Sequence, residues 1–400
     1  MKGTTTVNYQ YRLRLTRAQA EALDHQLGLA AHLYNAALEQ RKLLWKQRRK
    51  ALGYLEQAAE LKALRREFPE YGALNHTALQ NVLRRLDKAF RRFFKSLERG
   101  EKAGYPRFKR KDRFRTLDFT YGDGAKLIPD GRGGQVLRLH GVGWVRLVWH
   151  RDLPPGAKVK RVWVTKKADG WYATFALEVP SEAVRRPLPP TGKGVGVDVG
   201  LENLLALSDG TLVDNPRWLK EAEERLKEKQ RVLSRKPKGS KRWRRLKAQI
   251  ARLHQRVARK RRDFYLKLAW DLVRGYDLIA VEDLNLKGLS QGTLAKAVHD
   301  AGWGVFLRET LPYIAWKAGR EVVFVDPKGT SQTCALCGAS VPKPLSERLH
   351  ACPSCGHTVH RDVNAAQVIL SRARSGPTGV PVGGRSPAPC PYEAGGFSRQ

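Results

Sequence analysis

Alternating and helical patterns of apolar residues predict one strand and three helices in the first quarter of the chain. Apolar residues alternate with polar or basic ones over 7–15, which predicts a half-buried strand with a basic outer face. Thr16 followed by Gln19 forms a capping box, so a long helix should begin there. Further helices are predicted at 54–66 and at about 77–97. On the last helix we interpret the aromatic and aliphatic face as core, and the Arg and Lys face as a nucleic-acid contact.

A change of period after the basic loop 104–111 predicts β-structure. Short alternating runs lie at 117–121, 136–139, 142–149, 159–165 and 171–179. Runs of this kind, bounded by turn residues, are typical of small barrels. We expect these strands to form a barrel together with the strand at 7–15, so that the three helices are an insertion. The proline-rich segment 181–192 is interpreted as a linker.

Beyond this linker strands and helices alternate, which favours a twisted mixed sheet covered by helices. The stretch GVGVDVGLEN, at 194–203, predicts a strand, a tight glycine turn and the start of a second strand. Two more strands are predicted at 278–282 and 322–325, with a helix at 305–319 between them.

The charge of the chain points to a polyanionic partner. Lys and Arg number 75 against 38 Asp and Glu, which gives a formal net charge of +37. Nucleic acid fits this excess better than an anionic membrane does, and the surfaces of halotolerant or thermophilic proteins usually mix both signs. Residues 217–274 are strongly helical, and no acidic residue occurs between Lys229 and Arg262. We interpret this helix as facing phosphates.

Length and the start of the chain set further limits. The 400 residues suggest two to four domains. No apolar run approaches the roughly 20 residues that span a bilayer, and the polar start MKGTTT leads into no apolar signal segment. Because the cysteines occur mostly as CxxC pairs, a reducing compartment is favoured. We therefore expect a cytoplasmic, nucleoid-associated protein.

Four of the five cysteines form a pattern typical of a zinc site. Cys334 and Cys337 make one CxxC pair, Cys352 and Cys355 make a second, and fourteen residues separate the pairs. Four thiolates at this spacing bind a tetrahedral Zn²⁺ that stabilises the fold, whereas a redox function would need a single reactive pair. The fifth cysteine, Cys390, lies in a Gly-, Pro- and Ser-rich tail that we expect to be disordered.

Three acidic residues are candidates for a second metal site. Asp198 lies within an apolar strand, Glu282 ends the apolar run LIAVE, and Asp362 stands where a helix should begin. Hydrolysis of a phosphodiester benefits from two divalent cations held by carboxylates, and Mg²⁺ prefers such oxygen ligands. Alternatives stay open: Asp198 as a turn residue, Asp283 in place of Glu282, and Asp362 as a helix N-cap.

These motifs together resemble the TnpB family, the transposon-encoded family ancestral to type V CRISPR effectors. The similar segments are GVDVGLENLLALSDG, LIAVEDLNLKGL, TSQTCALCG…CPSCGHTVHRDVNAAQVIL, LYNAALEQRK and YPRFKRK. The resemblance covers residues 5–372 with all motifs in the same order. It departs at His360, where many relatives carry Asp.

The resemblance implies a multidomain α+β fold. An N-terminal wedge β-barrel with a helical recognition insertion would precede a RuvC nuclease domain of the RNase H-like α/β fold, with an inserted zinc ribbon. The implied ranges are 1–16 and 104–180 for the wedge barrel, 17–103 for the insertion, 181–192 for the linker, 193–328 and 358–374 for the nuclease, 329–357 for the ribbon and 375–400 for the tail.

The resemblance also implies the activity, that of an RNA-guided DNA endonuclease. A guide RNA from the transposon end and a short transposon-adjacent motif would select double-stranded DNA. Asp198, Glu282 and Asp362 would be the catalytic residues, holding two Mg²⁺ in a single RuvC site. We expect one protein monomer per RNA. Alternatives are a nuclease-silent guided repressor, a miniature type V CRISPR effector and an RNA-independent nuclease.

Overall fold

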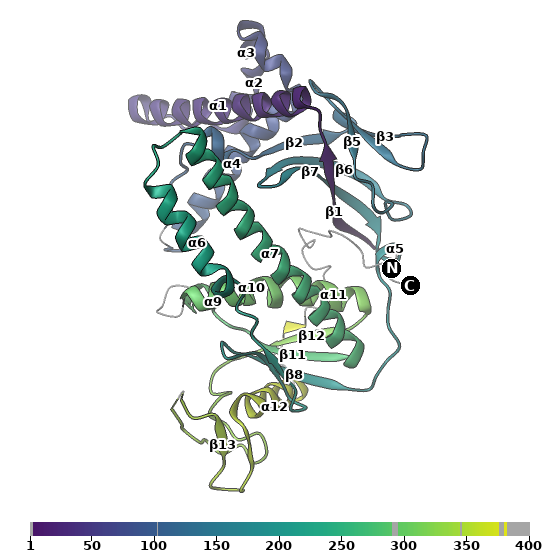
Figure 1. Ribbon diagram of the computed structural model, residues 1–400, viewed down its shortest axis with the longest axis vertical. Helices are drawn as coiled ribbons and strands as arrows, with labels where there is room; N and C mark the ends of the chain where they lie inside the picture. The colour runs from purple at the N-terminus through teal and green to yellow at the C-terminus, as the bar shows by residue number, and fades with distance from the viewer. Residues whose placement is uncertain (1–2, 102, 290–294, 345, 376–379, 382–400) are drawn as a thin grey trace. The chain divides into compact units, whose positions relative to one another are not determined.

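The computed structural model describes residues 3–101, 103–289, 295–344, 346–375 and 380–381. Among these residues the chain divides into two compact units, one formed by Thr4–Pro180 and the other by Gly3 with the described residues from Ser181 to Pro381. Each unit contains its own large sheet (Figure 1). None of the helices formed by the described residues is both long and apolar enough to cross a membrane.

The unit Thr4–Pro180 contains a closed seven-stranded barrel, which confirms the expected barrel. The strands are β1 (Thr4–Arg14), β2 (Thr116–Tyr121), β3 (Gly124–Pro129), β4 (Gln135–Leu139), β5 (Gly143–Leu147), β6 (Lys158–Lys167) and β7 (Gly170–Pro180), in the order β1-β5-β4-β3-β2-β6-β7. Large inward side chains such as Tyr11, Phe119 and Phe175 are fully buried. The sequence pattern did not predict β3, because the run AKLI within it lacks a clean alternation.

The helices between β1 and β2 form the insertion. They are α1 (Arg17–Arg48), α2 (Tyr54–Ala59), α3 (Leu61–Glu67), η1 (Pro69–Ala73) and α4 (His76–Glu98), followed by η2 (Lys111–Arg113). The capping box is confirmed, since the Thr16 hydroxyl accepts from the Gln19 N–H and the Gln19 side chain accepts from the Thr16 N–H. The prediction that the whole aromatic face of α4 is core is wrong at its C-terminal end. Phe90 is buried there, but Phe94 is 54% exposed.

The second unit is built on a six-stranded mixed sheet in the order β10-β9-β8-β11-β12-β15. Its strands are β8 (Gly194–Val199), β9 (Asn203–Leu207), β10 (Leu212–Asp214), β11 (Leu278–Glu282), β12 (Glu321–Val325) and β15 (Val380–Pro381). The central strands β8, β11 and β12 run parallel, and the others are antiparallel to their neighbours. This arrangement confirms the mixed α/β content expected from the alternation of elements.

Helices cover both faces of this sheet. The helices of the whole unit are α5 (Ser181–Val184), α6 (Trp218–Ser234), α7 (Lys241–Gly275), α8 (Leu286–Leu289), α9 (Ala295–Ala301), α10 (Trp303–Val305), the π-helix η3 (Phe306–Thr310), α11 (Leu311–Ala318) and α12 (Arg361–Arg374). Val195, Val197, Ile279 and Val281 pack with α7, η3 and α11 in the main core. On the other face, Ala280 packs with α12 in a smaller core. A short ribbon, β13 (Leu349–Ala351) paired with β14 (Thr358–His360), precedes α12.

The segment expected to be a linker is attached along its length to this unit. The N–H groups of Arg186 and Leu188 donate to carbonyls at the end of α11, and the Asp277 carboxylate accepts from the N–H groups of Thr191 and Gly192. Within the tail expected to be disordered, Val380–Pro381 forms β15 against β12. Cys390 and the remainder of 376–400 lie outside the described residues.

Candidate active site

The register between two parallel strands brings two of the three candidate acids together. Val281 of β11 lies opposite Val197 of β8, so the next residues, Glu282 and Asp198, are side by side on the same face of the sheet. Because the valines point into the main core, both acids point to the face covered by α12. Glu282 is 8% exposed, and Asp198 is half-buried.

Helix α12 brings the third acid to the same place, and Gly196 allows its close approach. A Cβ on Gly196 would lie 1.8 Å from the carbonyl oxygen of Ala366, so only glycine permits α12 to lie against β8 at this point. Asp362 lies in the first turn of α12, where the helix dipole favours a carboxylate. The N-cap is His360, whose Nδ1 accepts from the Asp362 N–H at 3.3 Å. The alternative that Asp362 is the N-cap is therefore wrong.

The closeness of these acids changes their titration. Burial raises the pKa of Asp198 well above its ordinary value, and the nearby carboxylates of Glu282 and Asp362 raise it further. Burial also raises the pKa of Glu282, although a hydrogen bond from the Thr330 hydroxyl acts in the opposite direction. Like charges crowded in this way favour a bound cation, and a set of carboxylate oxygens suits Mg²⁺.

The three carboxylates do not form a closed cage. Among the described residues, the four cysteines are the group of possible metal ligands that lies together, with all donor atoms within 4.8 Å of one another, and the three acids do not form such a group. Asp362 Oδ2 would lie 3.9 Å from a Cβ on Gly200, at the turn that follows Asp198. Such an open arrangement fits ions that retain several waters as ligands, as Mg²⁺ does.

Asp283, the rival of Glu282, has a different partner. Its carboxylate pairs with Arg308, whose guanidinium also lies over the Phe324 ring at 4.5 Å. The π-helix η3 carries Arg308, and its wider turn breaks the regular helical spacing there. The two neighbouring acids at the end of β11 therefore have different partners, and Glu282 is the one at the candidate site.

Arg348 is a functional candidate that no sequence pattern indicated. Its guanidinium pairs with Glu202 at 2.5 Å and lies 3.9 Å from the Asp362 carboxylate. The Arg361 N–H donates to the Arg348 carbonyl at 2.8 Å, which fixes this residue at the start of α12. One arginine among many basic residues carries no distinguishing signal, and its role depends on a fold contact. Thr330 was missed for the same reason, since 48 positions separate it from Glu282.

The four cysteines lie together as the sequence predicted. Cys334 and Cys355 have their sulfurs 3.7 Å apart, and those of Cys337 and Cys352 are 3.6 Å apart. Burial tends to raise the pKa of Cys352, but N–H groups of Ser354 and Cys355 stabilise its thiolate and lower the pKa to about 6. Four sulfurs at this spacing, with a thiolate favoured among them, fit a structural Zn²⁺.

The turn after each CxxC pair contains a glycine with a positive φ angle. Gly338 and Gly356 have φ angles of 76° and 73°, which other residues rarely adopt. Asn364, fully buried on α12, accepts from the Ala335 N–H and donates to the Thr333 carbonyl. The first cysteine turn is thereby attached to the helix that carries Asp362. In the sequence, the signal for this contact is a polar Asn beside the small and apolar residues of RDVNAA.

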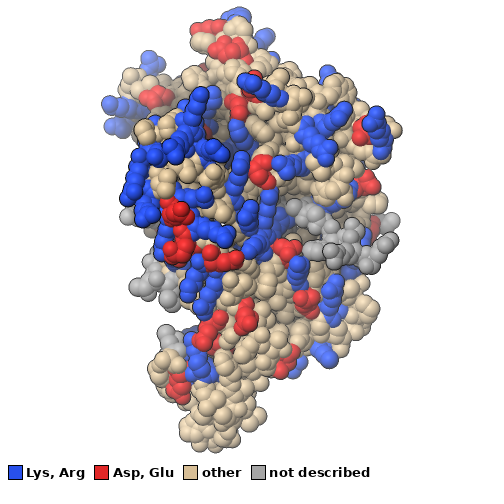
Figure 2. Space-filling view, in the orientation of Figure 1, with Lys and Arg blue, Asp and Glu red and all other residues tan. Residues whose placement is uncertain are grey.

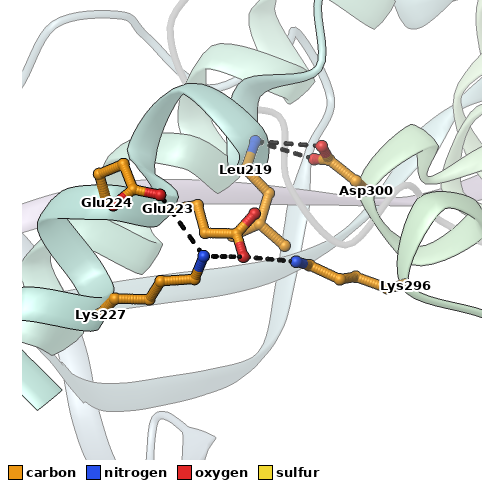
Figure 3. A network of polar contacts seen from close by, with 6 residues as sticks. All are labelled: Leu219, Glu223, Glu224, Lys227, Lys296 and Asp300. Atoms are coloured by element: carbon orange, nitrogen blue, oxygen red, sulfur yellow. Dashed lines mark hydrogen bonds and ion pairs between the residues drawn. The ribbon is translucent and has the colours of Figure 1, made fainter.

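The helices α6 and α7 form a strongly basic surface of this unit. Figure 2 shows Lys and Arg side chains gathered where Figure 1 places these two helices. The acids of α6 are largely engaged, because Glu223 pairs with both Lys227 and Lys296 (Figure 3). Asp300 of α9 accepts from the Leu219 N–H at 3.0 Å and so caps the start of α6 (Figure 3). The basic residues of α7 have no acid on their own helix until position 263.

Three family models match parts of this chain. A family model described as "Probable transposase" matches residues 174–293, a Cas12f1-like TNB domain matches 305–369, and a helix-turn-helix domain matches 1–50. Within 3–50, however, the chain forms β1 and the single helix α1.

Several curated proteins are similar over long stretches. A Streptomyces pristinaespiralis protein named as a candidate RNA-guided DNA endonuclease is 33% identical over 370 residues, or 91% of this chain and 88% of that protein. An Escherichia coli K12 protein with the same description is 32% identical and covers 73% of each chain. A CRISPR-associated DNA-binding protein, Cas12m of Allomeiothermus silvanus, is 34% identical over 133 residues, or 31% of this chain and 25% of that protein.

Solved structures overlap with this chain only weakly. The Cas12f1–sgRNA–target DNA complex covers 93% of this chain and 100% of its own, at 15% identity and a TM-score of 0.34. The mini-RNA-guided endonuclease CRISPR-Cas_phi3 covers 94% and 93%, at 11% identity and a TM-score of 0.46.

Proposed function

The chain belongs to the TnpB family, and from this premise we propose that it is an RNA-guided endonuclease that cuts double-stranded DNA. The observation that carries the proposal is the parallel register that sets Asp198 beside Glu282, with α12 adding Asp362 on the same face. The names of its relatives support the nuclease class.

The partners follow from the charge and from the relatives. A guide RNA from the transposon end would pair with one DNA strand, and the protein would read a short adjacent motif in the duplex. A net charge of +37 and the basic surface of α6 and α7 support extensive contact with phosphates. In this proposal the barrel is the wedge domain, the helices inserted in it are the recognition domain, and the second unit is the RuvC-like nuclease with its zinc ribbon.

Mechanistically, two Mg²⁺ held by Asp198, Glu282 and Asp362 would supply an activated water and stabilise the leaving oxygen. The carboxylates of Glu282 and Asp362 both lie close enough to Asp198 to raise its pKa, so Asp198 would act with each of them in holding the ions. The Thr330 hydroxyl holds one oxygen of Glu282, so that carboxylate enters the reaction already oriented. Arg348 offsets part of the negative charge at Asp362.

A single site would have to cut both strands in turn, since the sequence shows no second nuclease motif. Zn²⁺ at Cys334, Cys337, Cys352 and Cys355 would stabilise the ribbon that presents Arg348. We further propose that binding of the guide and target precedes cutting, as the displaced strand can enter only once it is unpaired.

A second candidate is a guided DNA-binding protein that does not cut. The similarity of 31% of this chain to a protein named as a CRISPR-associated DNA-binding protein supports it. The presence of all three acids at one face of the sheet favours the nuclease instead.

The test compares Asp198→Ala with Asp283→Ala, its matched control outside the site. Purified protein with its co-expressed transposon-end RNA is mixed with plasmid carrying the matching target. We expect Asp198→Ala to bind the target and fail to cut it, and Asp283→Ala to cut it. Cutting by Asp198→Ala at the wild-type rate would refute the site, and equal cutting by RNA-free protein would refute guidance.

A further inference from the structure

Aromatic rings lie exposed at one end of the helical insertion. Phe94 is 54% exposed, Tyr105 43% and Phe108 47%. Phe94 belongs to the last turns of α4, and the other two belong to the loop that follows it. Single exposed apolar residues are ordinary, but three large rings within fifteen positions are not. With Phe93, we call these residues the aromatic patch.

Three rings of the patch, those of Phe93, Phe94 and Tyr105, form a connected cluster. The ring centroid of Phe93 lies 5.3 Å from that of Phe94 and 5.2 Å from that of Tyr105, both in edge-on geometry. The buried Phe90 supports them from below, at 5.5 Å from Tyr105. Because the rings hold one another, their exposed faces are already oriented and would lose little freedom on binding.

One cation lies over a ring of the patch, and a buried one lies over the supporting Phe90. The Lys42 ammonium is 4.6 Å from the Phe108 centroid, and the Arg41 guanidinium is 5.0 Å from the Phe90 centroid. Residues 91–111 contain nine Lys and Arg against two Glu. A surface of this charge repels a second copy of itself, and lysine is depleted from apolar protein interfaces.

We propose that the aromatic patch binds single-stranded nucleic acid by stacking its unpaired bases. Every base has a flat π-face that can stack on an aromatic ring, and the phosphates between bases match the cations around the patch. In a duplex the base faces are already stacked on one another, so a duplex could bind only through its phosphates and the cations around the patch. The inference deepens the proposed function, because a guided nuclease handles both unpaired RNA and an unpaired DNA strand.

The experiment measures binding by the full chain in the Asp198→Ala background, so that no probe is cut. The probes are a single-stranded RNA containing 2-aminopurine, the DNA strand of the same sequence, and the corresponding blunt duplex. Stacking quenches 2-aminopurine fluorescence, and titration gives the affinity. Loss of one stacked base lowers affinity on the order of 10-fold to 100-fold.

Four variants separate stacking from general apolar contact. Phe94→Ala and Phe94→Leu should both weaken single-strand binding and restore fluorescence, because leucine keeps apolar area but has no π-face. Phe94→Tyr should bind as the parent does. Leu97→Ala, which removes a 50% exposed aliphatic side chain one turn away, should also bind as the parent does.

The outcomes decide the proposal. If the variants weaken binding of RNA alone, the patch binds guide-type strands; if they weaken binding of DNA alone, it binds a displaced strand. If they weaken both, the patch accepts either strand. Each of these three results supports the proposal. Parent-like binding by Phe94→Leu, equal weakening of the duplex, or a change only in self-association on sedimentation would overturn it. Target cutting by the same patch variants in an Asp198-intact chain is scored separately, so the proposed function can stand if the platform falls.

Discussion

Gly196→Ala tests whether the contact between β8 and α12 sets the candidate active site. The added Cβ would lie 1.8 Å from the Ala366 carbonyl oxygen and 2.8 Å from the Leu370 N–H nitrogen. Both neighbours are backbone atoms of α12, so no side chain can rotate to make room. The helix and the strand must therefore move apart, and they carry Asp362 and Asp198 respectively.

The size of this shift can be stated from the structure. Real Cβ contacts hardly occur below 3.0 Å, so the gap at the Ala366 oxygen must widen by at least about 1.2 Å. Overpacking of this kind costs typically about 1–3 kcal/mol of folding free energy. A misplacement of about 1 Å among catalytic groups costs on the order of 100-fold in rate. We expect Gly196→Ala to fold, and to cut DNA about 100-fold more slowly.

The matched control is Gly194→Ala, two residues earlier on the same strand and face. Its Cβ would meet side-chain atoms only, with Arg374 Nη2 and Leu370 Cδ1 each at 3.3 Å. Those flexible side chains can move by a few tenths of an ångström, so stability and rate should stay close to wild type.

The assay is single-turnover plasmid cleavage with the guide RNA bound, accompanied by thermal unfolding and by target binding. Binding should be nearly unchanged in both variants, since the strand and helix shift lies at the acids. Wild-type cutting by Gly196→Ala would refute the reasoning, as would equal losses in the two variants.

Three further changes have definite expected results. Asp198→Asn should raise the thermal midpoint in buffer without added divalent cations. Burial and the charge of Glu282 raise the pKa of Asp198, so its ionised form destabilises the fold. The difference in thermal midpoint between variant and wild type should shrink as the pH falls, because the wild-type carboxyl then becomes protonated. Cys352→Ser should lose zinc and thermal stability together, while Cys390→Ser should keep the full zinc content by elemental analysis. Thr330→Val removes the hydrogen bond to the buried Glu282 carboxylate and should raise the activation free energy of cleavage by roughly 1–3 kcal/mol. Thr330→Ser keeps the hydroxyl and should cleave at the wild-type rate.

Local rules in the sequence predicted much of this architecture. The capping box at Thr16, the barrel strands and the four-cysteine cluster depend on neighbours within a few positions or on a strict spacing. Alternation along 278–282 also placed Ala280 and Glu282 on one face, as the structure has them. What alternation could not give was the register between strands eighty positions apart, which decides that Asp198 is the neighbour of Glu282.

The contacts that the sequence did not reveal join distant positions. Arg348 and Thr330 reach the acids only because the ribbon and the loop after β12 fold back onto them. The proline-rich 181–192 looked like a flexible linker, since composition does not show that Asp277 accepts its N–H groups. Phe94 was assigned to the core because helical periodicity identifies an apolar face but not how far the partner surface extends.

Helix α12 joins the candidate acid site and the four-cysteine cluster, which the sequence presented as separate motifs. Within two turns it places Asp362 at the acids, holds the first cysteine turn through Asn364, and lies against Gly196 through Ala366. A helix is stiff over this length, so a displacement imposed at any one of these attachments moves the other two. The zinc ribbon carries none of the three acids, yet loosening it would release Arg348 and the start of α12 together. In the proposed nuclease the cysteines would therefore affect catalysis through the position of α12, which a purely stabilising role assigned from spacing alone does not capture.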